Sequence, residues 1–306
     1  MPRQADYSKF SKKAKAVPFE LFKKLFQLVL QKCSRQTRRQ LKLPKELLLI
    51  DSTTITVGKT RLPWAPFHGE RAGIKLHVAF HPSSGQPLNV VETEGLRHDG
   101  PVGEQLANDA FILVQDRAYG KIERFDRYLA EGQSFVIRLK DNVHLVNPHA
   151  LRRQKIEHST VVRDITCQLG KKQCRSEKRH RVVIFDDGHG HDIRVVTDMR
   201  TISAEQVADI YKARWQIELF FRWIKQHLNV PSIFGTSENA VYGQLYAALI
   251  VYVLVRFLFD TGCSIVPKHA ALTFVQFSRL LLLDKLPSIW LVKLAVLKDY
   301  RRLFAI

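Results

Sequence analysis

The sequence predicts a mixed α/β fold in which one sheet is flanked by helices and interrupted by a β-rich insertion. Two short apolar runs, residues 46–51 and 110–116, each end in an aspartate, as buried strands do when they deliver a side chain to a sheet edge. Stretches with helical periodicity surround these runs, and residues 140–200 switch to short alternating segments separated by turn residues. This order of strands and helices matches a mixed sheet.

The first 45 residues are strongly basic and are predicted to form a separate helical segment. Apolar residues between Phe19 and Leu30 recur at helical spacing, and lysines precede and accompany them. An amphipathic helix of this kind either follows the phosphates of a nucleic acid or covers part of the core.

Residues 46–139, together with 201–306, are predicted to form the core of the fold. The run that ends at Asp51 is its first strand. Alternating residues on both sides of the turn 82–85 predict a β-hairpin. The predicted elements after the first strand are hairpin strands over 73–80 and 86–94, a helix over 99–109, a strand ending at Asp116, a helix over 121–131 and a strand over 134–139.

Residues 140–200 are predicted to form a β-rich insertion domain. Strands are expected over 160–169, 181–187 and 192–197, between turns rich in Gly, His and Asp. Ser203 follows the insertion, and serine is a preferred N-cap residue, so we expect a long helix to begin there.

The composition limits the kind of protein and its partner. With 306 residues, of which 45% are hydrophobic, the chain suits a folded protein with a sizeable core rather than a disordered one. Lys and Arg total 48 against 29 Asp and Glu, and the resulting net charge of +19 favours a polyanion, with nucleic acid first and an anionic membrane second. Four scattered cysteines and the lack of a signal peptide predict a reducing, intracellular location.

One apolar run, residues 240–259, raises the question of a membrane span. Gln244 and Arg256 interrupt it, so no stretch of about 18 uninterrupted apolar residues remains. The pattern favours a helix buried in the core of a water-soluble protein, and no membrane partner is expected.

Four polar residues lie along one side of the helix predicted after Ser203. At about 100° per residue, Tyr211, Arg214, Glu218 and Lys225 fall within a wedge of about 60°. One carboxylate is therefore flanked by two cations and a phenol, which suits a site that handles phosphates. The same spacing also occurs in ion pairs on exposed helices, so the helix alone leaves both interpretations open.

Two strand-borne aspartates, Asp51 and Asp116, and the helix-borne Glu218 are the ingredients of a two-metal phosphodiester site. Paired Mg²⁺ ions about 3.5–4 Å apart need hard, anionic oxygen ligands, and they clamp the attacking and leaving oxygens of an in-line displacement. Arg214 and Lys225 could hold substrate phosphates, Arg through its planar fork and Lys as a point charge.

These residues resemble the three motifs of the DDE transposases of bacterial insertion sequences, in the insertion-sequence-four family. The resemblance rests on LLLIDSTTI around Asp51, on VQDRAYG around Asp116 and on the Y-x2-R-x3-E-x6-K helix, and it covers most of residues 46–260. The segments GIKLH (73–77), GLRHD (95–99) and Asn239-Ala-Val are similar as well. The family implies a ribonuclease-H-like (retroviral-integrase-like) core with a β-rich insertion between the second aspartate and the glutamate.

The resemblance also implies an activity and its site. Such enzymes cut DNA at the ends of a mobile element and join the freed 3′ hydroxyl to target DNA, using two Mg²⁺ ions, for which Mn²⁺ is an expected substitute. The expected partners are terminal inverted repeats, target DNA and further copies of the chain, as a homodimer or higher multimer, in the bacterial cytoplasm at the nucleoid. By motif position, the metal ligands would be Asp51, Asp116 and Glu218, and the DNA contacts would be Tyr211, Arg214 and Lys225.

One departure from the family keeps alternatives open. Only 50 residues precede the first aspartate, whereas family members usually carry a longer N-terminal domain that recognises the terminal repeats. The chain is expected to be either a truncated copy or one whose other surfaces recognise the ends. A catalytically inactive DNA-binding product and another ribonuclease-H-like nuclease are the alternative functions. For a DNA hairpin intermediate, the aromatic candidates are Trp64, Trp215 and Trp223.

Overall fold

The computed structural model describes residues 7–33, 43–151, 157–227 and 233–299. The chain divides into two compact units. The first, Gln36–Phe220, is called the sheet unit here, and the second, Met1–Arg35 with Phe221–Ile306, is called the helical unit.

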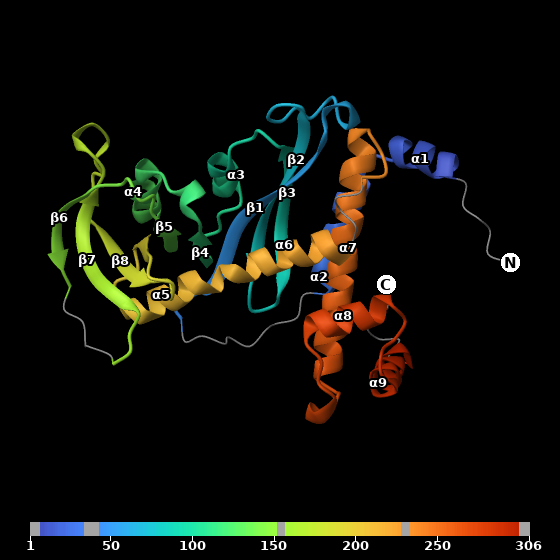
Figure 1. Ribbon diagram of the computed structural model, residues 1–306. Helices are drawn as coiled ribbons and strands as arrows, with labels where there is room; N and C mark the ends of the chain where they lie inside the picture. The colour runs from blue at the N-terminus through green and yellow to red at the C-terminus, as the bar shows by residue number, and fades with distance from the viewer. Residues whose placement is uncertain (1–6, 34–42, 152–156, 228–232, 300–306) are drawn as a thin grey trace. The chain divides into compact units, whose positions relative to one another are not determined.

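In the described part of the sheet unit, nine strands form one sheet in the order β3-β2-β1-β4-β5-β9-β8-β7-β6 (Figure 1). The central strands β1, β4 and β5 run parallel, and every other neighbouring pair is antiparallel. The predicted mixed sheet flanked by helices is confirmed. The strands are β1 (Glu46–Gly58), β2 (Arg71–His81), β3 (Gln86–Glu94), β4 (Phe111–Gln115), β5 (Phe135–Arg138), β6 (Leu145–Ala150), β7 (Val161–Leu169), β8 (His180–Asp186) and β9 (Asp192–Thr197).

The hairpin and the helices of this unit lie close to their predicted positions. Gly85 in the turn between β2 and β3 has a φ of +63°, a left-handed conformation that glycine adopts without strain. The helix predicted over 99–109 is shorter, α3 (Asp99–Gln105), and the next one is α4 (Ile122–Glu131). The strand β6 was not predicted, and its register with β7 is irregular.

The position of Asp51 differs from the prediction that a strand ends there. β1 continues to Gly58, because residues 52–58 are rich in β-branched side chains and pair with β2. The parallel pairing of β1 with β4 stops at Ile50 and Gln115. Asp51 therefore lies inside a strand, at the point where the parallel part of the sheet ends, whereas Asp116 follows the end of β4 as predicted.

The strands of residues 140–200 continue the central sheet. β9 pairs with β5, with Ile137 opposite Val196, and both side chains are fully buried. One apolar core extends across this junction, since Ile165 and Leu169 of β7 pack in the same cluster as Ile137. The division into 1–45, a core of 46–139 plus 201–306, and an insertion at 140–200 stays a prediction.

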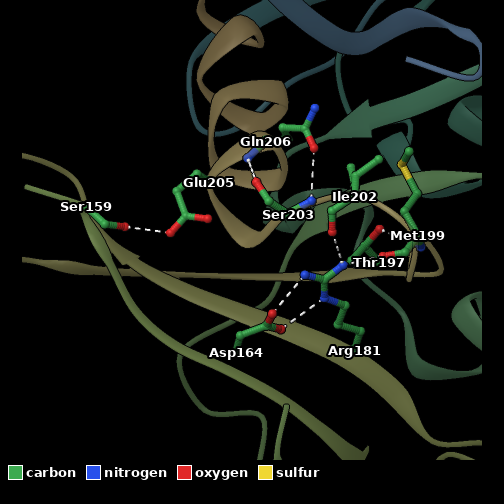
Figure 2. A network of polar contacts seen from close by, with 9 residues as sticks. All are labelled: Ser159, Asp164, Arg181, Thr197, Met199, Ile202, Ser203, Glu205 and Gln206. Carbon is green, nitrogen blue, oxygen red and sulfur yellow. Dashed lines mark hydrogen bonds and ion pairs between the residues drawn. The ribbon is translucent and has the colours of Figure 1, made fainter. Parts of the chain in front are cut away.

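A buried polar network ties the segment before α5 (Ala204–Ala213) to the inserted strands (Figure 2). Arg181 on β8 donates hydrogen bonds of 2.9 and 2.8 Å to the two carboxylate oxygens of Asp164 on β7. Its Nη1 donates to the carbonyls of Met199 and Ile202 at 2.6 and 2.8 Å. Both charged side chains are 4% exposed, so each depends on the other for its hydrogen bonds.

The long helix predicted after Ser203 is two helices, α5 and α6 (Trp215–His227), with Arg214 between them. Ser203 caps α5 as predicted, in a capping box with Gln206 that Figure 2 shows. At the break, the N–H of Arg214 donates to the carbonyl of Tyr211, a three-residue spacing that tightens the helical turn. The backbone of Arg214 keeps helical dihedral angles, so α6 follows α5 without a loop.

The helical unit is built around α7 (Glu238–Cys263), which packs against α2 (Phe19–Cys33). Phe19 and Phe26 of α2 contact Tyr242 and Tyr246, with ring centroids 5.1 and 5.9 Å apart. By length and composition α7 could cross a membrane, but 56% of its apolar window is buried inside the protein, as in a core helix. The other α-helices described in this unit are α1 (Tyr7–Ala16), α8 (Phe274–Leu282), α9 (Ser288–Asp299) and the last residues of α6, from Phe221 to His227.

Candidate active site

Three carboxylates of the sheet unit come from three different elements. Asp51 lies on β1, Asp116 directly follows β4, and Glu218 is in the first turn of α6. Because Ile50 and Gln115 are partners in the parallel register, the two aspartates follow at neighbouring positions on adjacent strands.

Arg214 and Tyr211 connect these three acids. Nη1 of Arg214 lies 2.8 Å from Oε1 of Glu218 and 3.6 Å from Oδ2 of Asp51. The Tyr211 hydroxyl donates a hydrogen bond of 3.2 Å to Oδ1 of Asp116. The guanidinium carbon of Arg214 is also 5.5 Å from the centre of the Tyr211 ring. One cation and one phenol therefore stand among three carboxylates, and five of the six predicted site residues form one cluster.

The site perturbs the ionisation of its own residues. Burial raises the pKa of Asp51 to about 6, and the nearby charges of Asp116 and Glu218 raise it further. The hydrogen bond from the Ser52 N–H and the charge of Arg214 lower this pKa, but they do not outweigh burial. Burial also raises the pKa of Tyr211 to about 12. Burial alone would lower the pKa of Arg214, but Tyr211, Asp116 and Glu218 raise it above its ordinary value. The guanidinium charge is thus retained where negative charge is crowded.

The donor set fits a hard divalent cation in chemical type, since it offers three carboxylates. Within the described residues, no three His, Cys, Asp or Glu side chains already stand at metal-ligand spacing. Arg214 contacts the oxygens of Asp51 and Glu218 that a metal ion would need. A metal ion at these oxygens would therefore compete with Arg214.

Comparison with known proteins decides the family. The family model described as "Transposase DDE domain" matches residues 42–254, which include all three acids. The chain belongs to the DDE transposases of the insertion-sequence-four family. A transposase assigned to insertion sequence element IS5377 of Geobacillus stearothermophilus is 58% identical over 93% of this chain and 75% of its own length.

A more distant relative is named a transposase as well. A transposase of element IS4SA from Synechocystis is 28% identical over 95% of this chain and 82% of its own length. Among solved structures, a piggyBac transposase synaptic complex with hairpin DNA is 13% identical, with a TM-score of 0.43, over 82% of this chain and 54% of that one.

A polar network that sequence reasoning missed supports Asp51 in this transposase. The carboxylate of Asp51 accepts a 2.8 Å hydrogen bond from the N–H of Ser52, whose hydroxyl donates to Oδ1 of Asp99 at 2.7 Å. Lys75 donates to the same oxygen at 3.2 Å, and Nδ1 of His77 lies 3.6 Å from it. His98 occupies the N-cap position of α3 and no side chain caps that helix, so the Asp99 carboxylate serves this network rather than the helix end. The signal for this network was the similarity of GIKLH and GLRHD to the family.

The remaining predicted residues lie in different settings. Lys225 follows Glu218 by seven residues on α6, in the part of the chain that belongs to the helical unit, and burial lowers its pKa. Trp223 is 4% exposed and donates to Ser278, so it is not accessible to a DNA base, whereas Trp215 is 50% exposed. The contact of Lys225 with DNA stays a prediction.

An open hollow of about 480 Å³ adjoins the site. It is lined by Asp116 and by the segments that follow β4 and β5, including Arg117 and Lys140. Asp141 lines the hollow as well and lies 3.5 Å from Arg117, so the lining holds two acids and two cations and gives a substrate room beside Asp116 without a net positive charge.

Proposed function

We propose that this transposase cuts DNA at the ends of an insertion sequence and joins the freed 3′ hydroxyl to target DNA. The single observation that carries the proposal is the cluster of Asp51, Asp116 and Glu218, delivered by three elements around Arg214. A protein that only bound DNA would not need three acids at the point of contact, because carboxylates repel phosphates.

Asp51, Asp116 and Glu218 would hold the metal ions. A bound pair of Mg²⁺ ions, for which Mn²⁺ is an expected substitute, would supply the charge that stabilises the attacking and leaving oxygens of an in-line displacement. Burial raises the pKa of Asp51 to about 6, and the charge of a metal ion beside this carboxylate would lower that pKa and favour the ionised form.

Arg214, Tyr211 and Lys225 would contact the transposon-end DNA. Arg214 is the residue that changes partners, since its guanidinium can leave the carboxylates for a phosphate and offer two parallel N–H donors to it. Tyr211 would keep Asp116 oriented through its hydroxyl while its ring stays against the guanidinium.

The proposed partners are terminal inverted repeats, target DNA and a second copy or more of the chain, in the bacterial cytoplasm at the nucleoid. The net charge of +19 supports a polyanionic partner. The open hollow beside Asp116 leaves room for a large substrate to reach the acids.

Cleavage by acid variants tests the proposal. Glu218→Gln and Asp116→Asn should bind duplex DNA as the parent does in the absence of metal, and should lose Mg²⁺-dependent nicking of DNA that carries the element ends. Glu131→Gln, an exposed acid at the end of α4, is the matched control and should cleave normally. Cleavage by Glu218→Gln at the parental rate would contradict the assignment.

Two measurements separate the alternative functions. An inactive DNA-binding product would bind the ends without metal-dependent nicking by the parent. Another ribonuclease-H-like nuclease would nick, but it would not join element ends to a target plasmid. Joined products with the parent chain, lost in Glu218→Gln, are the expected result.

A further inference from the structure

The connection between β7 and β8 carries a compact group of cations that the carboxylate site does not include. Lys171, Lys172, Arg175 and Lys178 are all exposed, and Glu177 is the one acid among residues 171–178. None of these four cations forms an ion pair with another residue that the structure describes. We call residues 171–178 the basic loop.

The backbone of the basic loop is held in place from both sides. The carboxylate of Asp126 on α4 accepts hydrogen bonds from the N–H groups of Glu177 and Lys178, at 2.8 and 3.1 Å. The buried hydroxyl of Ser176 accepts from the Leu169 N–H at 2.9 Å and donates to the Lys178 carbonyl at 2.8 Å. The loop backbone thus keeps four cations close together although they repel one another. A bound polyanion would reduce this repulsion.

The basic loop lies within reach of DNA that is bound at the candidate active site. Lys121, Arg175 and Lys178 line one hollow of about 730 Å³. Lys121 follows Asp116 by only five residues. Five residues span at most about 18 Å when fully extended, which is less than the roughly 34 Å of one turn of B-form DNA. A duplex that runs from Asp116 toward Lys121 would therefore bring phosphates near this hollow.

The hollow suits a phosphate backbone better than a small free anion. Its lining includes Glu123 and Glu177 as well as the cations, and these acids would repel an anion that entered deeply. Asp126 is already occupied, since it accepts from His180 at 2.9 Å in addition to the two backbone groups. The exposed cations at the rim can contact a backbone that passes over the hollow without entering it.

We infer that the basic loop binds the phosphate backbone of duplex DNA beside the site that holds Asp116. This inference rests on the proposed function, because the DNA concerned is the duplex cut at that site. Contacts of this kind neutralise phosphates and release counterions, and they orient the duplex without reading its sequence. The basic loop is thus a backbone clamp separate from the Tyr211 and Arg214 contacts.

A charge-neutralised variant tests the clamp. K171Q/K172Q/R175Q/K178Q is compared with K59Q/R71Q/R163Q/R200Q, which removes four exposed cations elsewhere in the sheet unit. Binding of a random-sequence duplex is measured against salt concentration. Each lost phosphate contact lowers the slope of log K against log salt by about 0.9, so the loop variant should lose about 2 to 4 units of slope and the control less than about 1.

A footprint on the loop itself gives a second measurement. Cys174 is exposed within the basic loop, whereas Cys33 and Cys167 are buried. In a Cys263→Ser background, Cys174 is the one remaining exposed cysteine, and a thiol reagent reports on it alone. DNA should slow its modification severalfold in the parental loop and leave it unchanged in the charge-neutralised loop.

The outcomes separate the clamp from the proposed function. Equal slopes for the two quadruple variants, or modification of Cys174 that DNA does not slow, would overturn the clamp while Mg²⁺-dependent nicking by the parent still supports the transposase function. Absence of both DNA binding and nicking in the parent would overturn the proposed function itself. A shallower slope with DNA protection of Cys174 supports the clamp.

Discussion

Replacing Arg181 by methionine is expected to destabilise the sheet unit by about 3–5 kcal/mol, the usual cost of removing one partner from a buried ion pair. The variant would leave the Asp164 carboxylate, 4% exposed, without its two charge-assisted donors. The carbonyls of Met199 and Ile202 would lose a donor as well. A loss of this size is a large share of the roughly 5–15 kcal/mol that stabilises a typical domain.

Companion variants show whether the buried charge is the cause. Asp164→Leu combined with R181M removes both charges, so it should be less destabilised than R181M alone. It should still lose about 1–3 kcal/mol, because the two carbonyls remain unsatisfied. Arg163→Met, an exposed position next to Asp164 on β7, is the control and should stay within about 0.5 kcal/mol of the parent.

Hydrogen exchange is the suitable assay, since unfolding of a chain with two compact units need not be two-state. Amides of β7, β8 and the start of α5 should exchange faster in R181M, and those of the helical unit should change little. Two results would refute the argument. One is an opening free energy for these amides in R181M that lies within about 0.5 kcal/mol of the parent value, and the other is a lower opening free energy in the double variant than in R181M.

Two further predictions concern pH and the site. Burial lowers the pKa of His77 from 6.5 to about 4, so the folded protein binds fewer protons than the unfolded chain between these values. The contribution of His77 to the free energy of unfolding should be fully present above about pH 6.5 and be lost as the pH decreases toward about 4. Urea unfolding of His77→Gln should therefore show a free energy of unfolding that falls less steeply over this pH range than that of the parent. The same pH dependence in both proteins would contradict this prediction. Tyr211→Phe removes the hydrogen bond to Asp116, worth about 1 kcal/mol, and should slow single-turnover cleavage about fivefold. Cleavage by Tyr211→Phe at the parental rate would show that this bond does not orient Asp116.

Local patterns were sufficient for the elements that carry the site. The apolar runs before Asp51 and Asp116 predicted β1 and β4, and Ser203 predicted the start of α5. Each of these signals depends on side chains within a few residues of one another, so no distant contact is needed to recognise it.

The motifs predicted which residues to inspect, but not how they are arranged. Asp51 lies inside β1 because β2 pairs along its second half. The predicted single helix is interrupted at Arg214, whose side chain contacts Asp51 on β1 as well as Glu218 on its own helical segment. These features depend on pairing between strands and on contacts between residues far apart in the sequence.

The sequence by itself determined the residue types of the site, the order of the strands that deliver them and the positive charge that suits DNA. Only the tertiary structure decided that Arg214 occupies the centre of the acids, that Asp99 supports Ser52 behind Asp51, and that β9 joins the insertion to β5. The physical reason is that periodicity records which face of an element is buried, whereas the partner on that face is chosen by packing among segments that are distant along the chain.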